Sequence, residues 1–313
     1  MTERFSQPAL AAVDWGTSSF RLWLLTGGGA VVRESRSNEG MIHCSDGSFA
    51  QTLQRHLDVV RAPAAIPVII CGMAGARQGW VEAPYLDVPT SLDALPQAAV
   101  MAPQTAGRDI RILPGLRQHD ARAPNVMRGE ETQLFGVTGA AEAQLVCMPG
   151  THCKWVALES GTVVSFQTYM TGELFAVLGQ HSILRHALVA GGRPEADDPV
   201  FLKAFDTAFA DPGAAWFRLF EVRPAQLLGF EAEKDGAAHL SGLLIGAELG
   251  AASNEARLRK VTLVAETRRG SLGALYASGL DRGGFDVTKI DSEEASRRGL
   301  LLAARQIWEL NDG

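Results

Sequence analysis

The sequence feature that most constrains the fold of this chain is a short glycine–threonine turn that occurs twice. Gly16-Thr17 follows an apolar run that ends at Val13, and Gly150-Thr151 follows another apolar run, 134 positions later. In both places a further apolar run begins a few residues after the threonine. A small polar turn between two short apolar runs predicts a β-hairpin. Two such hairpins, far apart in the chain, therefore predict two similar lobes in tandem.

Each hairpin is followed by a third apolar run, a helical pattern and a later strand, so both halves predict an α/β lobe. Short apolar runs bounded by turn residues predict strands at 9–13, 20–25, 31–35, 67–71, 110–113, 145–148, 154–158, 162–166 and 261–265. Apolar residues at helical spacing predict helices after Ser48 and at 129–139, 173–178, 237–252 and 293–310.

We therefore predict an α/β fold of two lobes, each a mixed sheet flanked by helices, with a cleft between the lobes. The first lobe is expected over residues 1–138 and the second over 139–313, with the last helix able to pack back on the first lobe. The 313 residues suit two domains, and the 46% of hydrophobic residues suffices for two cores. The stretch 191–199, rich in glycine, proline and aspartate, is the one linker-like segment.

Composition excludes several classes of function. The net charge is −6 and no long basic run occurs, so nucleic acid is not an expected partner. No apolar stretch reaches about 18 residues and the N-terminus lacks a signal-peptide pattern, which predicts a cytoplasmic protein without a membrane partner. The four cysteines form no CxxC pair, which indicates reduced thiols. The sequence leaves the oligomeric state open, a homo-oligomer included.

The first glycine–threonine turn, residues 14–19, has the composition of a phosphate-binding hairpin. Small residues at Gly16, Thr17 and Ser18 let backbone N–H groups approach phosphate oxygens closely. Asp14, at the end of the strand, can hold a hydrated Mg²⁺ ion. A turn of this type also occurs in ordinary hairpins, and taken alone the plain structural interpretation is favoured. No Lys-Ser/Thr pair follows the glycines at 27–29, so they predict a loop tip and not a P-loop.

The second glycine–threonine turn, residues 149–154, is the equivalent of the first in the other lobe. The N–H groups around Gly150 and the Thr151 hydroxyl suit the β- and γ-phosphates of a nucleotide. Lys154 either adds a positive charge at the phosphates or is a solvated strand residue, and the two interpretations have equal weight. His152-Cys153 lacks a second ligand pair at zinc spacing, so a zinc site is not predicted.

An acidic pair follows an arginine where a helix is expected to begin. Glu130 and Glu131 suit the helix N-terminus through the helix dipole, whereas Arg128 opposes that dipole and needs another reason. A functional interpretation makes one carboxylate the base that takes a proton from an attacking hydroxyl. The other carboxylate would then hold Arg128 or the substrate.

Three further places offer candidate contacts. Thr171 is expected to cap a helix, and Glu173 behind it is a candidate for a substrate or interlobe contact. Thr267 lies in a loop at the end of a strand, where an adenosine contact and a plain surface loop are equally supported. Arg77 is a candidate fork for a substrate carboxylate, and Trp80 either lines that site or packs.

Taken together, these segments resemble the 2-dehydro-3-deoxygalactonokinase family, and the resemblance covers nearly the whole chain. Its longest and most specific segments are the R-G-E-E-T-Q and P-G-T-H-C-K-W-V motifs. The matching blocks lie at 12–18, 126–134, 148–156, 170–174, 219–223 and 241–248. One position departs from the family pattern: Ala265-Glu266-Thr267-Arg268 stands where a small Gly-Thr-Ser turn is expected, and Glu266 there would crowd or repel a nucleotide.

The resemblance implies an actin-like ATPase (ribonuclease H-like) fold and the transfer of phosphate from ATP, with Mg²⁺, to the 6-hydroxyl of 2-dehydro-3-deoxy-D-galactonate. The product would be an aldolase substrate in galactonate catabolism. By position, Asp14 and Thr17 match the first phosphate loop and Gly150 and Thr151 the second. Glu130 matches the catalytic carboxylate, with Glu131 as the fallback.

Two alternatives stay open on the sequence. The chain could phosphorylate another 2-keto-3-deoxy sugar acid, such as the gluconate epimer. It could also be a nucleotide-gated regulator or assembly protein of the same fold that phosphorylates no small molecule.

Overall fold

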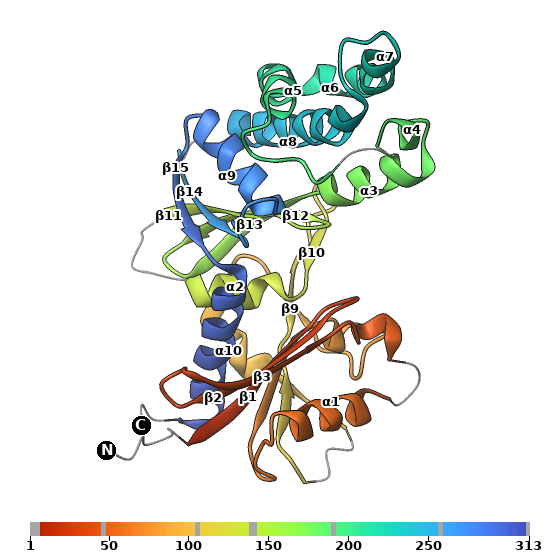
Figure 1. The fold of residues 1–313 in the computed structure, drawn as a ribbon. Helices are drawn as coiled ribbons and strands as arrows, with labels where there is room; N and C mark the ends of the chain where they lie inside the picture. The colour runs from red at the N-terminus through yellow and green to blue at the C-terminus, as the bar shows by residue number, and fades with distance from the viewer. Residues whose placement is uncertain are drawn as a thin grey trace, which may run out of the picture. The chain divides into compact units, whose positions relative to one another are not determined.

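The structure is a computed structural model that describes residues 7–44, 48–103, 107–137, 143–188, 192–255 and 259–310 (Figure 1). The chain forms two compact units. Unit 1 comprises residues 1–142, 159–165 and 293–313, and unit 2 comprises 143–158 and 166–292. The expected lobe boundary after residue 138, the end of the predicted helix at 139 and the first residue of the linker-like segment lie outside the described residues.

Unit 1 contains a six-stranded sheet in the order β3-β2-β1-β4-β8-β7. The first three strands are antiparallel, β4 and β8 continue the sheet in parallel with β1, and β7 closes it antiparallel to β8. Asp14 near the end of β1 pairs with Arg21 on one side and Cys71 on the other. The strands are β1 (Pro8–Trp15), β2 (Phe20–Thr26), β3 (Val31–Ser37), β4 (Val68–Gly72), β7 (Val100–Met101) and β8 (Ile110–Ile112).

Three helices accompany this sheet: α1 (Ser48–Val59), α2 (Glu130–Val137) and α10 (Ser292–Trp308). The core includes Trp15 and Phe20 from the strands and Phe49 from α1. Helices α2 and α10 meet through glycines, because a Cβ atom on Gly299 would lie 1.8 Å from the Thr132 carbonyl oxygen. Only glycine permits so close an approach of two backbones.

Unit 1 also holds a small sheet in the order β10-β9-β5. Its strands are β5 (Tyr85–Asp87), β9 (Gly115–Gln118) and β10 (Asn125–Met127), and β10 leads directly into α2. The short strand β6 (Thr90–Ser91) pairs with Thr162 and Val163 at the start of β13 (Thr162–Tyr169), and these paired residues belong to unit 1. Unit 1 thus fixes the position of the N-terminus of α2 with a separate sheet.

Unit 2 repeats the main strand order of unit 1. Its strands lie in the order β15-β14-β11-β12-β13, which matches the β8-β4-β1-β2-β3 order of unit 1 element for element. As in unit 1, the two outer strands are parallel to the first. The predicted tandem repeat is therefore confirmed. The strands are β11 (Ala143–Met148), β12 (Cys153–Glu159), β13 (Thr162–Tyr169), β14 (Lys260–Val264) and β15 (Asp286–Ile290).

Helices of unit 2 pack around the long helix α8 (Gly236–Glu255), and Figure 1 shows α5, α6 and α7 on the side of α8 away from the sheet. Gly242, Gly246 and Gly250 form a stripe along α8, where a Cβ atom would lie 2.4–2.5 Å from carbonyl oxygens of α5. The other helices are α3 (Thr171–His181), α4 (Arg185–Leu188), α5 (Pro199–Ala210), α6 (Ala215–Arg218), α7 (Val222–Leu227) and α9 (Leu272–Arg282).

The strands predicted from apolar runs all occur, and so do the predicted helices within the described residues. Strand β15 and helices α5 and α9 were not predicted, and neither were the short elements β5, β6, β7, β9, β10, α4, α6 and α7. None of the described helices combines the length and apolar character needed to cross a bilayer.

Candidate functional site

The first glycine–threonine turn closes the β1–β2 hairpin of unit 1. The Gly16 N–H donates to the Ser19 carbonyl at 2.9 Å, and Thr17 and Ser18 are exposed at the tip. The turn packs tightly on Gly40, where a Cβ atom would lie 2.4 Å from the Thr17 carbonyl oxygen. The small residues therefore let this backbone turn pack on the next segment and still present its tip to solvent.

Asp14 is the acidic side chain at the base of this turn. Its side chain is 19% exposed, and its Oδ2 atom lies 3.5 Å from the Arg21 guanidinium. Burial raises the pKa of Asp14 above its ordinary value; Arg21 opposes the rise, and Glu293 and Glu130 add to it. Because burial and the acidic neighbours disfavour the charged form of this carboxylate, a nearby cation would stabilise that form. Hard oxygen donors of this kind fit Mg²⁺.

Glu130 and Glu131 begin α2 but have different surroundings. Glu130 is partly exposed, and its Oε2 atom accepts the backbone N–H of Arg128 at 3.1 Å. Glu131 is fully buried, and both its oxygens accept the N–H of Gly129, at 2.7 and 2.9 Å. Burial and the adjacent Glu130 raise the pKa of Glu131 to about 8. Glu130 is thus the carboxylate of the pair that a substrate can reach, and Glu131 holds the backbone that positions it.

The backbone before α2 approaches the end of β4. Gly129 has a positive φ of 107°, and its hypothetical Cβ atom would lie 3.5 Å from the Cα atom of Gly72. Gly72 has a φ of 89° and lies against Trp15 at the end of β1. A Cβ atom on Gly72 would lie 2.6 Å from the Trp15 carbonyl oxygen. These contacts bring the start of α2 to the end of β1, where the first glycine–threonine turn begins.

The Arg128 side chain lies against the β5 region, whereas its backbone N–H donates to Glu130. Its guanidinium lies 4.2 Å from the centre of the Tyr85 ring and donates to the Ala83 carbonyl at 2.9 Å. Its third nitrogen is buried and has no hydrogen-bond partner among the described residues. Arg128 thus anchors the segment before α2 to the β5 region.

The predicted carboxylate site around Arg77 receives little support from its geometry. The Arg77 side chain is 82% exposed and lies 3.5 Å from Glu82. Trp80 is partly buried and packs against the core, with its ring nearly parallel to that of Phe49 and edge-on to that of Trp15. Arg77 therefore stays a prediction, and the packing alternative for Trp80 describes its contacts.

Unit 2 contains a pocket of about 450 Å³ at the second glycine–threonine turn. Gly150 and Thr151 form one end of it. Apolar side chains of α3, α8 and α9 form its wall, with one serine on α8 and one at the N-terminus of α9; these residues are Phe175, Leu244, Ile245, Leu272, Leu275, Ser241 and Ser271. An apolar pocket with a glycine–threonine turn at one end suits a nucleoside with its phosphates at the turn.

Helix α3 begins against the second glycine–threonine turn. A Cβ atom on Gly172 would lie 2.4 Å from the Gly150 carbonyl oxygen, so only glycine fits there. The Glu173 N–H donates to the Thr151 carbonyl at 3.0 Å, and the Glu173 side chain pairs with His152 at 2.5 Å. Glu173 thus orders the turn, and its predicted substrate or interlobe contact is untested.

One of the two interpretations of Lys154, and the expected role of Thr171 as a cap, were wrong. Lys154 is not solvated: it is 4% exposed, and its Nζ atom donates to the His152 carbonyl at 3.1 Å. Thr171 does not cap α3, because the helix begins at Thr171 itself and no side chain caps it. The Thr171 hydroxyl instead donates to Glu248, 77 positions away.

Glu248 is the centre of a buried network behind the second glycine–threonine turn. Its carboxylate accepts hydrogen bonds from Trp155 Nε1 at 2.8 Å, from Tyr276 Oη at 2.6 Å and from the Thr171 hydroxyl. Burial raises the pKa of Glu248, and these hydrogen bonds, with one from Cys153, oppose the rise. One carboxylate thus ties α8 to β12, α3 and α9, which carry or support the lining of the pocket.

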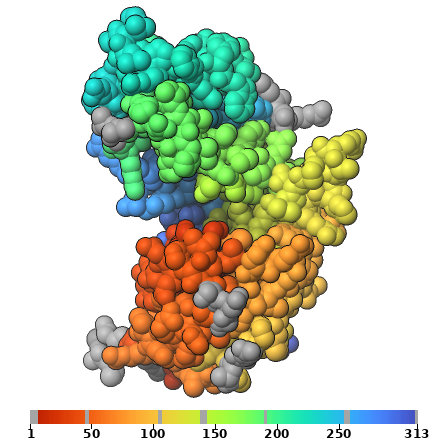
Figure 2. Space-filling model, turned by 90° about the vertical axis from the view of Figure 1, so that its right-hand side faces the viewer, coloured from red at the N-terminus to blue at the C-terminus, as the bar shows by residue number. Residues whose placement is uncertain are grey.

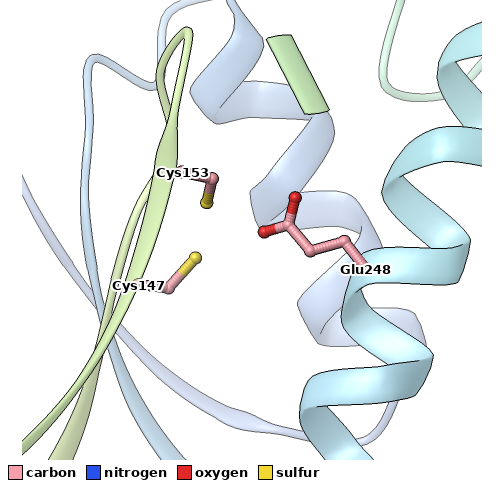
Figure 3. Close-up of side chains that lie close together, drawn as sticks. All are labelled: Cys147, Cys153 and Glu248. Carbon is pink, nitrogen blue, oxygen red and sulfur yellow. The ribbon is translucent and has the colours of Figure 1, made fainter. Parts of the chain in front are cut away.

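Cys147 and Cys153 stand at the two ends of the second glycine–threonine turn and point toward Glu248 (Figure 3). The three ligand atoms lie within 4.8 Å of one another, which is close enough to hold a metal ion. Burial raises the pKa of both thiols, so they stay protonated, and the Glu248 oxygens already accept three donors. We therefore interpret the cluster as a hydrogen-bonded support of the turn.

The loop after β14 places its residues on two different hollows. Glu266 and Arg268 line the 450 Å³ pocket and lie 2.5 Å apart as an ion pair. Thr267, the predicted nucleotide contact, lines a separate hollow with Arg269 and Lys289. The ion pair with Arg268 offsets the negative charge of Glu266. It therefore reduces the repulsion between Glu266 and a phosphate group that the sequence predicted.

Comparisons with known proteins identify the chain. A model of the 2-keto-3-deoxy-galactonokinase family matches residues 14–303. Over 96% of this chain and 98% of the relative, the sequence is 48% identical to the probable 2-dehydro-3-deoxygalactonokinase DgoK1 of Rhizobium meliloti (strain 1021). It is 35% identical to the 2-dehydro-3-deoxygalactonokinase of Escherichia coli (strain K12), over 95% and 97% of the two chains.

Solved structures agree. A crystal structure of a 2-dehydro-3-deoxygalactonokinase protein from Sinorhizobium meliloti superposes with a TM-score of 0.91 at 48% identity, covering 96% of this chain and all of the other. An activator of 2-hydroxyisocaproyl-CoA dehydratase from Clostridium difficile, at 12% identity, a TM-score of 0.52 and 96% coverage of both chains, shares the fold alone.

The repeated sheet order, the two glycine–threonine turns and these matches define a sugar kinase with the actin-like, ribonuclease H-like fold that the sequence predicted. Within that class, the chain belongs to the 2-keto-3-deoxy-galactonokinase family.

Proposed function

We propose that this protein transfers the γ-phosphoryl group of ATP to the 6-hydroxyl of 2-dehydro-3-deoxy-D-galactonate. The observation that carries the proposal is family membership over residues 14–303, with 48% identity to a curated relative over nearly its full length. The paired glycine–threonine turns and the partly exposed Glu130 supply the parts that phosphoryl transfer needs.

ATP is proposed to bind with its nucleoside in the 450 Å³ pocket of unit 2. Gly150 and Thr151 would meet the phosphates, and Lys154, buried beside the turn, would add positive charge. The Glu266–Arg268 pair would lie beside the nucleoside. Asp14 is the residue that would hold Mg²⁺, which would neutralise charge on the phosphates.

Glu130 is proposed to act as the general base. The 6-hydroxyl oxygen forms a bond to the γ-phosphorus, the bond from that phosphorus to the β-phosphate oxygen breaks, and ADP leaves. The hydroxyl proton passes to the Glu130 carboxylate. Glu130 suits this role because the Arg128 N–H fixes one of its oxygens while its side chain stays partly exposed.

The decisive experiment is a coupled ADP-release assay across a panel of aldonates and 2-keto-3-deoxy sugar acids, with plain hexoses as controls. We expect the highest kcat/KM with 2-dehydro-3-deoxy-D-galactonate. A preference for the gluconate epimer would change the substrate and keep the kinase. Activity on hexoses alone would exclude a sugar-acid kinase, and no activity on any acceptor would favour the regulator.

A pair of variants tests the base. Glu130→Gln should leave ATP binding nearly intact and lower kcat by about a hundredfold or more, because the acceptor hydroxyl loses its proton acceptor. Glu34→Gln, an exposed carboxylate on β3 of the same unit, is the matched control and should keep full activity. An unchanged kcat in Glu130→Gln would remove Glu130 from the role.

A further inference from the structure

The outer helices of unit 2 carry an unusual exposed apolar surface. Six large side chains in the segment 216–230 are 63–80% exposed, and we call them the apolar patch: Trp216, Phe217, Phe220, Leu227, Leu228 and Phe230. They belong to α6, α7 and the turns beside these helices. Figure 2 shows this segment, coloured teal to cyan, at the surface of unit 2. So dense a group of exposed apolar side chains marks an interaction site.

The apolar patch is not needed to hold α6 and α7 on unit 2. Ala215 and Val222 are the buried anchors of the two helices, and Leu219 between them is partly buried. These residues pack against Leu240, Leu243 and Leu244 of α8. The helices thus already have an inward apolar face, and the apolar patch faces outward in addition to it.

The size of the apolar patch suits a stable protein interface. A large aromatic side chain offers about 150–250 Å². With 63–80% of each exposed, the four aromatic residues present on the order of 550 Å², and the two leucines bring the apolar patch to roughly 700 Å². The largest patch on an ordinary monomer is about 300–600 Å², whereas a standard interface buries about 800 Å² per partner.

We propose that the apolar patch is the contact surface of a homodimer, in which a second copy of this chain covers it. A two-fold interface pairs the same surface with itself, so it needs charges of both signs at its rim. The apolar patch has them: Arg218 lies over the Phe217 ring and 3.3 Å from Glu221. In a two-fold dimer, the arginine of one copy meets the glutamate of the other.

A recess next to Trp216 supplies a place for an anchor residue. Its volume is about 240 Å³, and it is lined mainly by apolar side chains of β13, α3, α6 and α8, among them Met170, Leu174 and Leu244. Aromatic anchors in such recesses carry most of the binding energy of an interface. An aromatic side chain of the second copy fits this recess.

The same charges argue against a membrane surface as the partner. Helices that lie on membranes have polar faces rich in lysine and arginine. The segment 216–235 instead mixes Arg218, Arg223 and Lys234 with Glu221, Glu231, Glu233 and Asp235.

Sedimentation velocity of the full chain tests the proposal. The wild-type protein should sediment as a dimer at micromolar concentration. Phe220→Glu and Phe230→Glu change side chains that are 63% and 80% exposed, and each should weaken dimerisation at least tenfold. Val59→Glu, on α1 of unit 1, changes a side chain of similar exposure, 66%, and should remain a dimer. Circular dichroism checks that each variant folds.

Hydrogen exchange of the wild-type protein gives a second test that needs no variant. Amides of residues 216–230 should exchange more slowly at high than at low protein concentration, while those of α1 should not change. A wild-type monomer at all concentrations up to about 100 μM, or a dimer that persists in both patch variants, would overturn the proposal. Adsorption of the monomer to lipid vesicles through the apolar patch would overturn it as well.

Discussion

The buried carboxyl group of Glu131 leads to a prediction about how stability depends on pH. Burial and the neighbouring Glu130 raise the pKa of Glu131 from 4.5 to about 8. Between these values the folded protein holds a proton that the unfolded chain has released. The contribution of Glu131 to stability therefore falls as the pH rises through this range, and this contribution is constant below about 4.5 and above about 8.

The size of the effect follows from the same shift. One pKa unit corresponds to about 1.36 kcal/mol, so a rise from 4.5 to about 8 corresponds to on the order of 5 kcal/mol. Glu131→Gln removes the titrating proton and keeps an oxygen to accept the Gly129 N–H. The free energy of unfolding of this variant should therefore fall less steeply with pH than that of the wild type. Between pH 4.5 and about 8, the two decreases should differ by on the order of 5 kcal/mol.

Urea unfolding at a series of pH values measures the difference. The fluorescence of Trp15, Trp23 and Trp80 reports on unit 1, because all three residues lie in its core or pack against it. The other buried carboxylates titrate alike in both proteins and cancel in the difference. Glu34→Gln, at an exposed position, should run parallel to the wild type. If the free energy of unfolding changed with pH in the same way for the wild type and Glu131→Gln, the conclusion that Glu131 is buried and neutral would be refuted.

Three further predictions concern unit 2. Gly172→Ala should raise the KM for ATP at least tenfold and lower the Tm, because the new Cβ atom would clash with the backbone of the second glycine–threonine turn. The control is Gly192→Ala, where a Cβ atom meets no neighbour, and it should change neither the KM nor the Tm. Lys154→Met should weaken ATP binding about tenfold in equilibrium titration, and an unchanged Kd would separate Lys154 from the phosphates. Glu248→Gln should lower the free energy of unfolding by about 3 kcal/mol in urea titrations, because an amide NH₂ faces three donors. Adding Thr171→Val to Glu248→Gln should restore part of the lost free energy of unfolding, because one of the three unpaired donors is removed. If the effects of the two substitutions on this free energy were simply additive, the hydrogen-bonded network would be contradicted.

The fold could be predicted because its main signals are local. Each glycine–threonine turn lies between apolar runs that are short enough to be strands, and the repeat of that pattern predicts two sheets of one kind. Of the helices that were missed, α5 does have a local signal, because Asp198 caps it and Pro199 is its first residue. Helix α9 has small residues inside its apolar face, with Gly273 and Gly279 against neighbouring segments, which hides its period. Whether a glycine packs or breaks a helix depends on contacts that the local pattern does not contain.

The candidate site was predicted less completely, because its details depend on residues far apart in the sequence. Glu130 and Glu131 are adjacent and chemically alike, and only the folded chain buries one and leaves the other partly exposed. The Thr171 hydroxyl has two chemically reasonable partners, the end of its own helix and a distant carboxylate. As a cap the hydroxyl would accept a backbone N–H at the start of its helix, but in the structure it donates to the Glu248 carboxylate, 77 positions away.

The glutamate at the end of the family segment 241–248 had no predicted role, and the structure supplies one. Gly242 and Gly246 let α8 lie directly on α5, and Glu248, two residues after Gly246, accepts hydrogen bonds from β12, α3 and α9. The same helix therefore carries both the packing glycines and the acceptor that links the elements around the 450 Å³ pocket. A change in the spacing of this segment would move both together. Its glycines and its glutamate are thus explained as one structural unit and not as separate binding residues.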